Sequence, residues 1–183
     1  MSTKPVEVEV KFRFRDHGKL KERLRELGAK LVDVVDMVDV YLQHPCKNFA
    51  VTDEALRVRF YRSSLRHGEN IELAYKGPRL EGWAKSRVEL VVRVGDFEGI
   101  LKVLNSIGFT EVARIVKHRE FYELDNVEIS LDRVEGLGDF VELEDRGAGA
   151  EGLRRVAEKL GLSEVVHETY LELYLKSRAS HST

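Results

Sequence analysis

The sequence is poor in cysteine, proline and methionine, and it has no long hydrophobic run. Its 183 residues include one cysteine, Cys46, with three prolines and two methionines. A single cysteine excludes an internal disulfide and is typical of a reducing compartment, so we expect a cytoplasmic protein. No apolar segment is long enough to span a membrane, and the N-terminus lacks the apolar core of a signal peptide. We therefore expect no membrane partner.

The sequence also lacks an excess of charge of one sign. Its 30 basic and 32 acidic side chains give a formal net charge of −2, although charged residues make up 34% of the chain. This balance does not favour general nucleic-acid binding, so the charges are expected to act locally. With 43% hydrophobic residues, the chain is long enough for a single domain with a sizeable core. We place this domain at 1–176, followed by a disordered tail at 177–183.

Strict alternation of apolar and charged residues is the strongest pattern in the chain. In the segment VEVEVKFRFR, from Val6 to Arg15, Glu7, Glu9 and Lys11 fall on one face and the valines and phenylalanines on the other. A period of two predicts a β-strand with one apolar face. Similar or valine-rich segments predict seven further strands, at 30–43, 55–62, 71–77, 86–94, 114–124, 126–134 and 140–145.

Helical spacing of apolar residues interrupts the strands. It predicts a helix at about 16–27, a second from residue 96 to about 108, a third at 149–160 and a short one over 167–175. Asp16 and Asp96 are the expected N-caps of the first two helices, and each precedes a glycine by the same offset. Glu9 precedes the first of these caps by as many residues as Glu89 precedes the second, so the two glutamates occupy equivalent places. We interpret this as two copies of a unit of strand, helix and further strands; a chance recurrence of helix length is the alternative.

These elements predict a mainly antiparallel α+β fold with a closed eight-stranded barrel and flanking helices. The charged faces would point inward, and the apolar faces would lie under the helices. Because burying unpaired charge is costly, the nearly balanced inward set favours a metal-bound polyanion as ligand. Carboxylates would hold the cation, and arginine and lysine side chains would grip phosphates. Alternatively, each charged face is simply solvated.

The charged positions also follow the motifs of a known family in order. Over residues 6–145 the chain resembles the CYTH domain family, also called triphosphate tunnel metalloenzymes. The region around Tyr170 resembles the closing SYxxLL segment of that family, with Thr169 in place of its serine. The other matching motifs are ExExK at 7–11, LRxR at 56–59, Lys-Gly-Pro at 76–78, SRxE at 86–89, KxR at 117–119, and Asp132 followed by GLGxFxExE at 136–144.

The resemblance implies an eight-stranded tunnel that binds a triphosphate through Mg²⁺ or Mn²⁺. It places metal binding on five glutamates: Glu7, Glu9, Glu89, Glu142 and Glu144. It places triphosphate contacts on seven basic residues: Lys11, Arg57, Arg59, Lys76, Arg87, Lys117 and Arg119. The residues implied in catalysis are Lys11, Lys76, Arg119 and Asp132.

Within the family, residues 41–57 look most like the class IV adenylyl cyclase branch, which implies conversion of ATP to cyclic AMP and pyrophosphate. A triphosphatase acting on tripolyphosphate, thiamine triphosphate or a nucleoside triphosphate is the first alternative, because it would use the same metal and cationic clamp. A non-catalytic nucleotide or polyphosphate sensor is the second, although here all the metal acids are present. A nucleic-acid-binding barrel would need an outward basic patch with stacking aromatics, which the pattern does not offer. We expect a monomer or a homodimer.

Four further features of the sequence bear on this hypothesis: the histidines, Cys46, Trp83 and two aspartates of the second strand. The histidines show no ligand spacing, and His118 alternates away from its basic neighbours, so we expect it to face outward. Cys46 has no catalytic context. Trp83 is either a lid residue at the tunnel mouth or a surface anchor. Asp36 and Asp39 on the second strand either reach the tunnel or lie on a solvated strand face, and we expect the solvated face.

Overall fold

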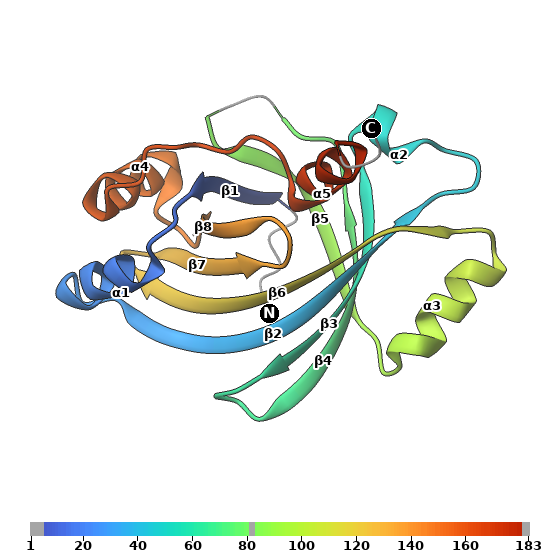
Figure 1. The fold of residues 1–183 in the computed structure, drawn as a ribbon, viewed down its shortest axis with the longest axis horizontal. Helices are drawn as coiled ribbons and strands as arrows, with labels where there is room; N and C mark the ends of the chain where they lie inside the picture. Colours follow the sequence, from blue (N-terminus) through green and yellow to red (C-terminus); the bar gives the residue numbers. More distant parts are fainter. Residues whose placement is uncertain (1–5, 81–82, 181–183) are drawn as a thin grey trace.

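Eight antiparallel strands close into a barrel (Figure 1). The computed structural model describes residues 6–80 and 83–180. The order around the barrel is β1-β5-β4-β3-β2-β6-β7-β8, which confirms the predicted fold class. The strands are β1 (Val6–Arg13), β2 (Lys30–Gln43), β3 (Ala55–Ser63), β4 (Gly68–Lys76), β5 (Lys85–Arg93), β6 (Thr110–Leu124), β7 (Val127–Val134) and β8 (Gly138–Asp145).

Helices lie outside this barrel or at its end. Three of them match the expected positions, whereas α2 has only four residues, too few to give a periodic signal. The last helix, α5, continues into the segment 177–183 that the sequence suggests is a tail; residues 181–183 lie outside the described residues. None of the described helices is long and apolar enough to cross a membrane. The helices are α1 (His17–Glu26), α2 (Phe49–Thr52), α3 (Phe97–Ser106), α4 (Gly149–Leu160) and α5 (Tyr170–Ala179).

The strand pairing confirms the internal repeat. On one wall Glu7 lies opposite Arg87 in the β1–β5 pair, and on another Met37 lies opposite Lys117 in the β2–β6 pair; both pairs join residues whose numbers differ by 80. When β1, β2, β3 and β4 are exchanged with β5, β6, β7 and β8 respectively, each strand keeps the same neighbours around the closed barrel. The barrel therefore consists of two units related by an approximate twofold axis through these two pairs.

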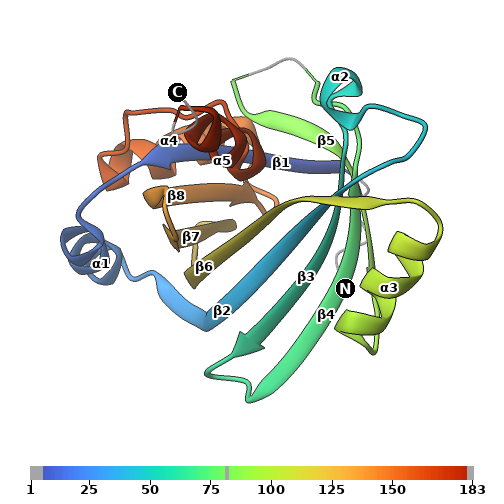
Figure 2. The ribbon, with the colours of Figure 1, turned by 45° about the vertical axis from the view of Figure 1, so that its right-hand side comes forward.

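The outer faces of the strands are covered by different helices in the two units. Leu20 and Leu24 of α1, with Leu153 of α4, pack on the outward side chains of β1, β7 and β8. Leu104 of α3 packs on outward residues of β2 and β3, including Val40 and Val58. Figure 2 shows α1 and α3 on opposite sides of the barrel. The apolar core thus lies mainly outside the barrel wall, and the lumen is left to polar groups.

One part of the lumen is filled by apolar side chains. Tyr41, Ile115 and Phe140 point inward and pack against Tyr170, the first residue of α5. Thr169 is the N-cap of α5: its hydroxyl accepts a hydrogen bond from the Glu172 amide, and the Glu172 carboxylate accepts one from the Thr169 amide. This capping box fixes the start of α5, so Tyr170 is held in place inside the barrel.

Candidate active site

A cavity of about 1680 Å³ runs through the barrel, and side chains from all eight strands line it. Twelve of the thirteen predicted site residues line this cavity. The exception is Asp132, which is fully buried in the wall behind Arg119. The twelve lining residues are Glu7, Glu9, Lys11, Arg57, Arg59, Lys76, Arg87, Glu89, Lys117, Arg119, Glu142 and Glu144.

Two of the four arginines predicted for the site are held by carboxylates. Arg59 on β3 donates two hydrogen bonds to Asp39 on β2, with Nε–Oδ1 at 2.5 Å and Nη2–Oδ2 at 2.7 Å. Arg119 on β6 donates in the same bidentate way to Asp132 on β7 and also contacts Glu142. Such paired, charge-assisted bonds fix a guanidinium in position. These two arginines can offer a ligand only their remaining donors.

Asp39 corrects a sequence-based expectation. The strand face that carries it was expected to be solvated, but Asp39 is 1% exposed and points into the barrel, whereas Asp36 is exposed and hydrogen-bonds to His118. Burial alone would raise the pKa of Asp39, but Arg59, Lys117 and Arg57 outweigh it and hold that pKa well below its usual range. Asp39 is therefore an ionised acid in the wall of the lumen.

The other two arginines lack such a clamp. Arg57 and Arg87 are 6% and 7% exposed. The Nη2 atom of Arg57 lies 3.6 Å from Glu89, and the Nε atom of Arg87 lies 3.9 Å from Glu7. Among the described residues, the buried Nε atoms of both arginines have no hydrogen-bond partner. Leaving a buried donor unsatisfied costs about 1–3 kcal/mol, so these two guanidinium groups are suited to receive an anion.

Three lysines complete the cationic lining. Lys11 lies 3.3 Å from Glu142 and 3.7 Å from the Tyr170 ring centre, and it donates a hydrogen bond to the Glu168 carbonyl. Lys76 lies 2.7 Å from Glu7 and 3.2 Å from Glu89.

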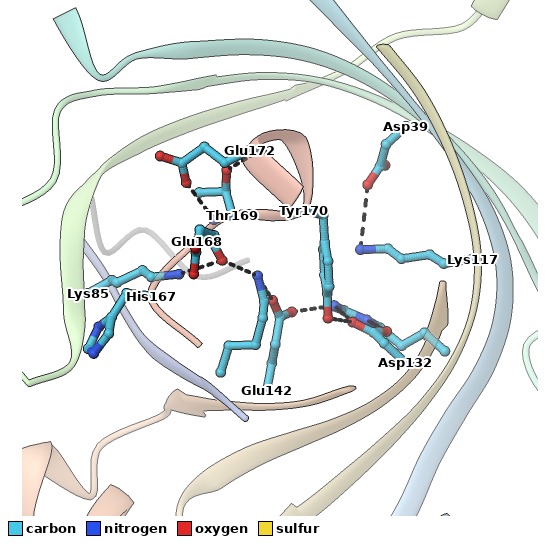
Figure 3. Close-up of polar contacts among 12 residues, drawn as sticks. Asp39, Lys85, Lys117, Asp132, Glu142, His167, Glu168, Thr169, Tyr170 and Glu172 are labelled. Atoms are coloured by element: carbon cyan, nitrogen blue, oxygen red, sulfur yellow. Dashed lines mark hydrogen bonds and ion pairs between the residues drawn. The ribbon is translucent and has the colours of Figure 1, made fainter. Parts of the chain in front are cut away.

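Lys117 differs from the other two because it is buried beside Arg119. It lies 3.5 Å from Asp39 and 4.7 Å from the Tyr170 ring centre. Burial, reinforced by the Arg119 charge, lowers the pKa of Lys117 to about 7. Figure 3 shows Tyr170 standing between Lys117 and Glu142, with its hydroxyl on Asp132. The charge of Lys117 therefore changes near neutral pH, next to the proposed phosphate site.

The acids fall into two groups. Glu7, Glu89 and Glu142 all form ion pairs with lysines or arginines of the lumen. Glu9 and Glu144 lie directly opposite each other on β1 and β8, and Glu144 pairs with Arg146 just beyond the end of β8. Burial, together with the nearby Glu7, Glu128 and Glu9 charges, raises the pKa of Glu144 to about 8 although Arg146 opposes the rise.

Carboxylates at the β1–β8 seam are the donor type that Mg²⁺ and Mn²⁺ prefer. Within residues 6–80 and 83–180, no three acidic, histidine or cysteine side chains stand close enough together to hold a metal as they are placed. The lysines and arginines that pair with Glu7 and Glu142 account for this, because each draws a carboxylate toward itself. The donor chemistry therefore fits a hard divalent cation, provided that some carboxylates exchange these partners for it.

Sequence reasoning assigned no site role to Asp39, which lies in the barrel wall, or to three residues that line the cavity, Glu128, Arg146 and Tyr170. Asp39 shares the period of two of β2 with Met37 and Tyr41, so its face could have been inferred. Glu128 has the same period as Asp132 on β7, but its neighbours across the sheet depend on strand register. Arg146 follows the end of β8, where the alternation stops. Tyr170 enters the lumen from a helix, and no strand pattern signals that.

Trp83 does not line the cavity. It packs against the cluster under α1 and α4, with the Arg154 guanidinium 4.7 Å from its ring centre. This position agrees with the surface-anchor alternative. Residues 81 and 82 of the same loop lie outside the described residues.

Comparison with known proteins agrees with this geometry. The CYTH domain matches residues 5–171. The chain belongs to the CYTH family. It is 34% identical to "Putative adenylate cyclase MJ0240" of Methanocaldococcus jannaschii over 92% of this chain and 98% of the relative.

Solved structures share the same fold. The PH1819 protein of Pyrococcus horikoshii OT3 matches with a TM-score of 0.82 and 35% identity, over 93% of this chain and 98% of that protein. HpAC1 from Hippeastrum, described as a putative adenylyl cyclase with a dominant triphosphatase activity, matches with a TM-score of 0.69 and 16% identity over 93% and 95% of the two chains. At that identity the second match shows the fold alone. The lumen described above is therefore that of a CYTH barrel.

Proposed function

We propose that the protein is a divalent-metal-dependent enzyme that acts on triphosphates in its lumen, with conversion of ATP to cyclic AMP and pyrophosphate as the leading reaction. The observation that carries this proposal is the pair of buried guanidinium groups, Arg57 and Arg87, whose Nε donors have no partner among the described residues. They come from β3 and β5, which flank β4 in the barrel wall, so a ligand that pairs with both must span the width of that strand. A chain of phosphates has the length and the charge to reach both.

The phosphate-binding residues are proposed from position and charge. Arg57 and Arg87 donate to phosphate oxygens, and Lys11 and Lys76 add point charges from β1 and β4. Arg59 and Arg119 contribute their remaining N–H donors while Asp39 and Asp132 hold them still. Lys117 becomes fully charged when a polyanion arrives, since a nearby negative charge raises the pKa of a lysine. Fixed donors of this kind stabilise the charge that develops during phosphoryl transfer without reorganising.

Glu9 and Glu144, with Glu7, Glu89 and Glu142 nearby, are the residues that would hold the cation. Bound Mg²⁺ or Mn²⁺ would supply neutralisation of the phosphate charge and polarisation of phosphoryl oxygens. In the cyclase reaction the ribose 3′-hydroxyl attacks the α-phosphorus, the bond from that phosphorus to the bridging oxygen breaks, and pyrophosphate leaves. The protein's part is to hold the triphosphate extended, so that the ribose can fold back onto its own α-phosphate.

Names of related proteins support the cyclase reaction. The relative from Methanocaldococcus jannaschii, which matches nearly the whole chain, carries the name "Putative adenylate cyclase MJ0240". A triphosphatase remains the second candidate, because a protein of the same fold, HpAC1, is described with a dominant triphosphatase activity. The two reactions use the same clamp and differ in the nucleophile, which is water in the second case.

A product assay tests the proposal. The protein is incubated with Mg²⁺ or Mn²⁺ and with ATP, tripolyphosphate or thiamine triphosphate, and the products are resolved as cyclic nucleotide, pyrophosphate or orthophosphate. Cyclic AMP with pyrophosphate is the expected result, and orthophosphate as the main product would establish the triphosphatase instead. Tight ATP binding without any product would make the protein a sensor. Arg57→Gln should abolish turnover, and Arg62→Gln, an exposed position on the same strand, is the matched control.

A further inference from the structure

Arg146, just beyond the end of β8, reaches back to the acidic side of the lumen. Its Nη1 atom lies 2.8 Å from Glu144, and its Nη2 atom lies 2.9 Å from Glu128. Its backbone amide donates to the carbonyl of Asn126, which fixes its Cα beside the β6–β7 turn. Arg146 therefore bridges two carboxylates with a side chain that is anchored only at its base.

The bridged carboxylates belong to the seam where a cation is expected. Glu144 has Glu9 opposite it on β1 and Glu128 opposite it on β7, so three carboxylates stand in one row across three strands. Like charges placed side by side repel one another. Within the described part of the chain, Arg146 is the basic side chain that forms an ion pair with Glu128 and Glu144. Its guanidinium supplies the positive charge beside Glu128 and Glu144, while Lys85 on β5 lies opposite Glu9 at the other end of the row.

The corresponding seam of the other unit holds its positive charge in a different way. There, Lys76 lies directly opposite Glu89 on the β4–β5 seam and is only 10% exposed. Lys76 lies within β4, and its ammonium pairs with both Glu7 and Glu89. Arg146 is 38% exposed and follows the end of a strand. A long, half-exposed side chain with one fixed end can turn away, whereas a buried strand lysine cannot.

A second small cavity beside the lumen can receive the displaced guanidinium. It has a volume of about 350 Å³, and Arg146 itself forms part of its wall. Glu123 lines this cavity and is the cross-strand neighbour of Glu128. Lys30, the cross-strand neighbour of Glu123 on β2, and Asp125 also line this cavity. A guanidinium that leaves Glu128 and Glu144 therefore reaches a cavity that holds two further carboxylates and one lysine.

We propose that Arg146 is a built-in counter-cation of the metal end: it bridges Glu128 and Glu144 in the metal-free lumen, and the incoming divalent cation displaces it toward Glu123. The inference rests on the proposed metal dependence and adds two residues, Glu128 and Arg146, that control access to the site. Arg146 acts on the metal through the carboxylates that it releases, so it is a positioning residue.

Calorimetric titration of Mn²⁺ and Mg²⁺ into the protein without substrate tests the inference. Arg146→Gln removes the competing charge and should tighten metal binding about tenfold. Arg146→Lys, which cannot bridge both carboxylates, should tighten it by a smaller factor. Arg133→Gln, an exposed arginine on β7 that pairs with Asp139, is the matched control and should leave the affinity unchanged.

The receiving carboxylate gives a second readout. Glu123→Gln should weaken metal binding about threefold in the parent protein, because the displaced guanidinium loses its acceptor, and should have no effect in the Arg146→Gln background. Metal affinity that is unchanged or weaker in Arg146→Gln overturns the inference alone. Absence of metal binding in the parent protein and in all variants overturns the proposed metal dependence, and the inference with it.

Discussion

The two units of the barrel place opposite charges at equivalent positions. In the first unit an aspartate on β2, Asp39, holds an arginine on β3, Arg59. In the second unit an arginine on β6, Arg119, is held by an aspartate on β7, Asp132. Asp39 and Arg119 differ by 80 in number, the offset of the repeat. The backbone is thus repeated while the charge pattern is inverted, so a twofold frame encloses an asymmetric lumen.

The same inversion distinguishes the two seams. Glu9 and Glu89 are equivalent, but Glu9 faces Glu144 whereas Glu89 faces Lys76. The residue opposite the glutamate is therefore a lysine, Lys76, in the β4–β5 seam and a second glutamate, Glu144, in the β1–β8 seam. This difference explains why we propose a cation at the β1–β8 seam and anion-binding groups elsewhere in the lumen.

Making the seams alike should have the largest effect. Glu144→Lys gives the β1–β8 seam the glutamate–lysine pair of the β4–β5 seam, and it should weaken Mn²⁺ binding by about 100-fold or more, because a ligand is lost and a positive charge is added. Calorimetric titration measures this loss. Glu135→Lys, an exposed change outside the lumen, is the control. Metal binding that survives in Glu144→Lys would place the site elsewhere.

The clamped and unclamped arginines should respond in different ways. Arg59→Gln leaves Asp39 buried without its main partner and should lower the free energy of unfolding by about 3 kcal/mol. Arg57→Gln removes a guanidinium with an unsatisfied donor and only longer ion pairs to Asp39 and Glu89, so it should cost less stability than Arg59→Gln, while triphosphate affinity falls about 50-fold. Urea denaturation and calorimetry separate the two effects. Equal stability losses in both variants would remove the distinction between the two classes of arginine.

The sequence predicted the strands and their charged faces because a period of two is visible without tertiary information. It could not separate Arg57 from Arg59, since both lie on the same face of β3. What separates them is the register with β2, which brings Asp39 opposite Arg59. The same limit hid Asp39, whose face was assigned to solvent. The motif resemblance identified lumen residues without showing which of them pair with each other.

A methionine and a lysine occupy equivalent positions at the β2–β6 seam, Met37 and Lys117. The folded-state pKa of Lys117 is lowered to about 7, from about 10.4 in an unfolded chain. Between pH values near these two pKa values, Lys117 is protonated in the unfolded chain but not in the folded protein, so the free energy of unfolding should rise with pH. Below the folded-state pKa, Lys117 is charged in both states, and the folded protein bears the full cost of burying that charge. Lys117→Met makes the two positions alike and should remove this rise, which is at most about 1.4 kcal/mol per pH unit. Urea denaturation at several pH values measures it, and parallel pH curves for the two proteins would contradict it.

The equivalent helix caps should give the smallest difference. The Asp16 side chain accepts from the Lys19 amide at the start of α1, and Asp96 accepts from the Gly99 amide at the start of α3. Each change to alanine should cost about 1 kcal/mol. We expect Asp16→Ala to lose more stability than Asp96→Ala. Helix α1 buries two leucines almost completely, whereas α3 has one buried leucine, which keeps 8% of its surface exposed. Thermal unfolding compares the two, and a larger loss for Asp96→Ala would contradict the assigned packing.

The central claim is that the lumen is built for a chain of phosphates. Calorimetric titration of ATP, ADP and AMP in the presence of Mg²⁺ tests it most directly. Arg57 and Arg87 lie on strands separated by β4, so we expect a monophosphate to leave at least one of them unpaired, and each buried guanidinium left unpaired costs about 1–3 kcal/mol. Affinity should therefore fall at least about tenfold with each phosphate removed, and Arg57→Gln should reduce that dependence. AMP binding as tight as ATP binding would contradict the account.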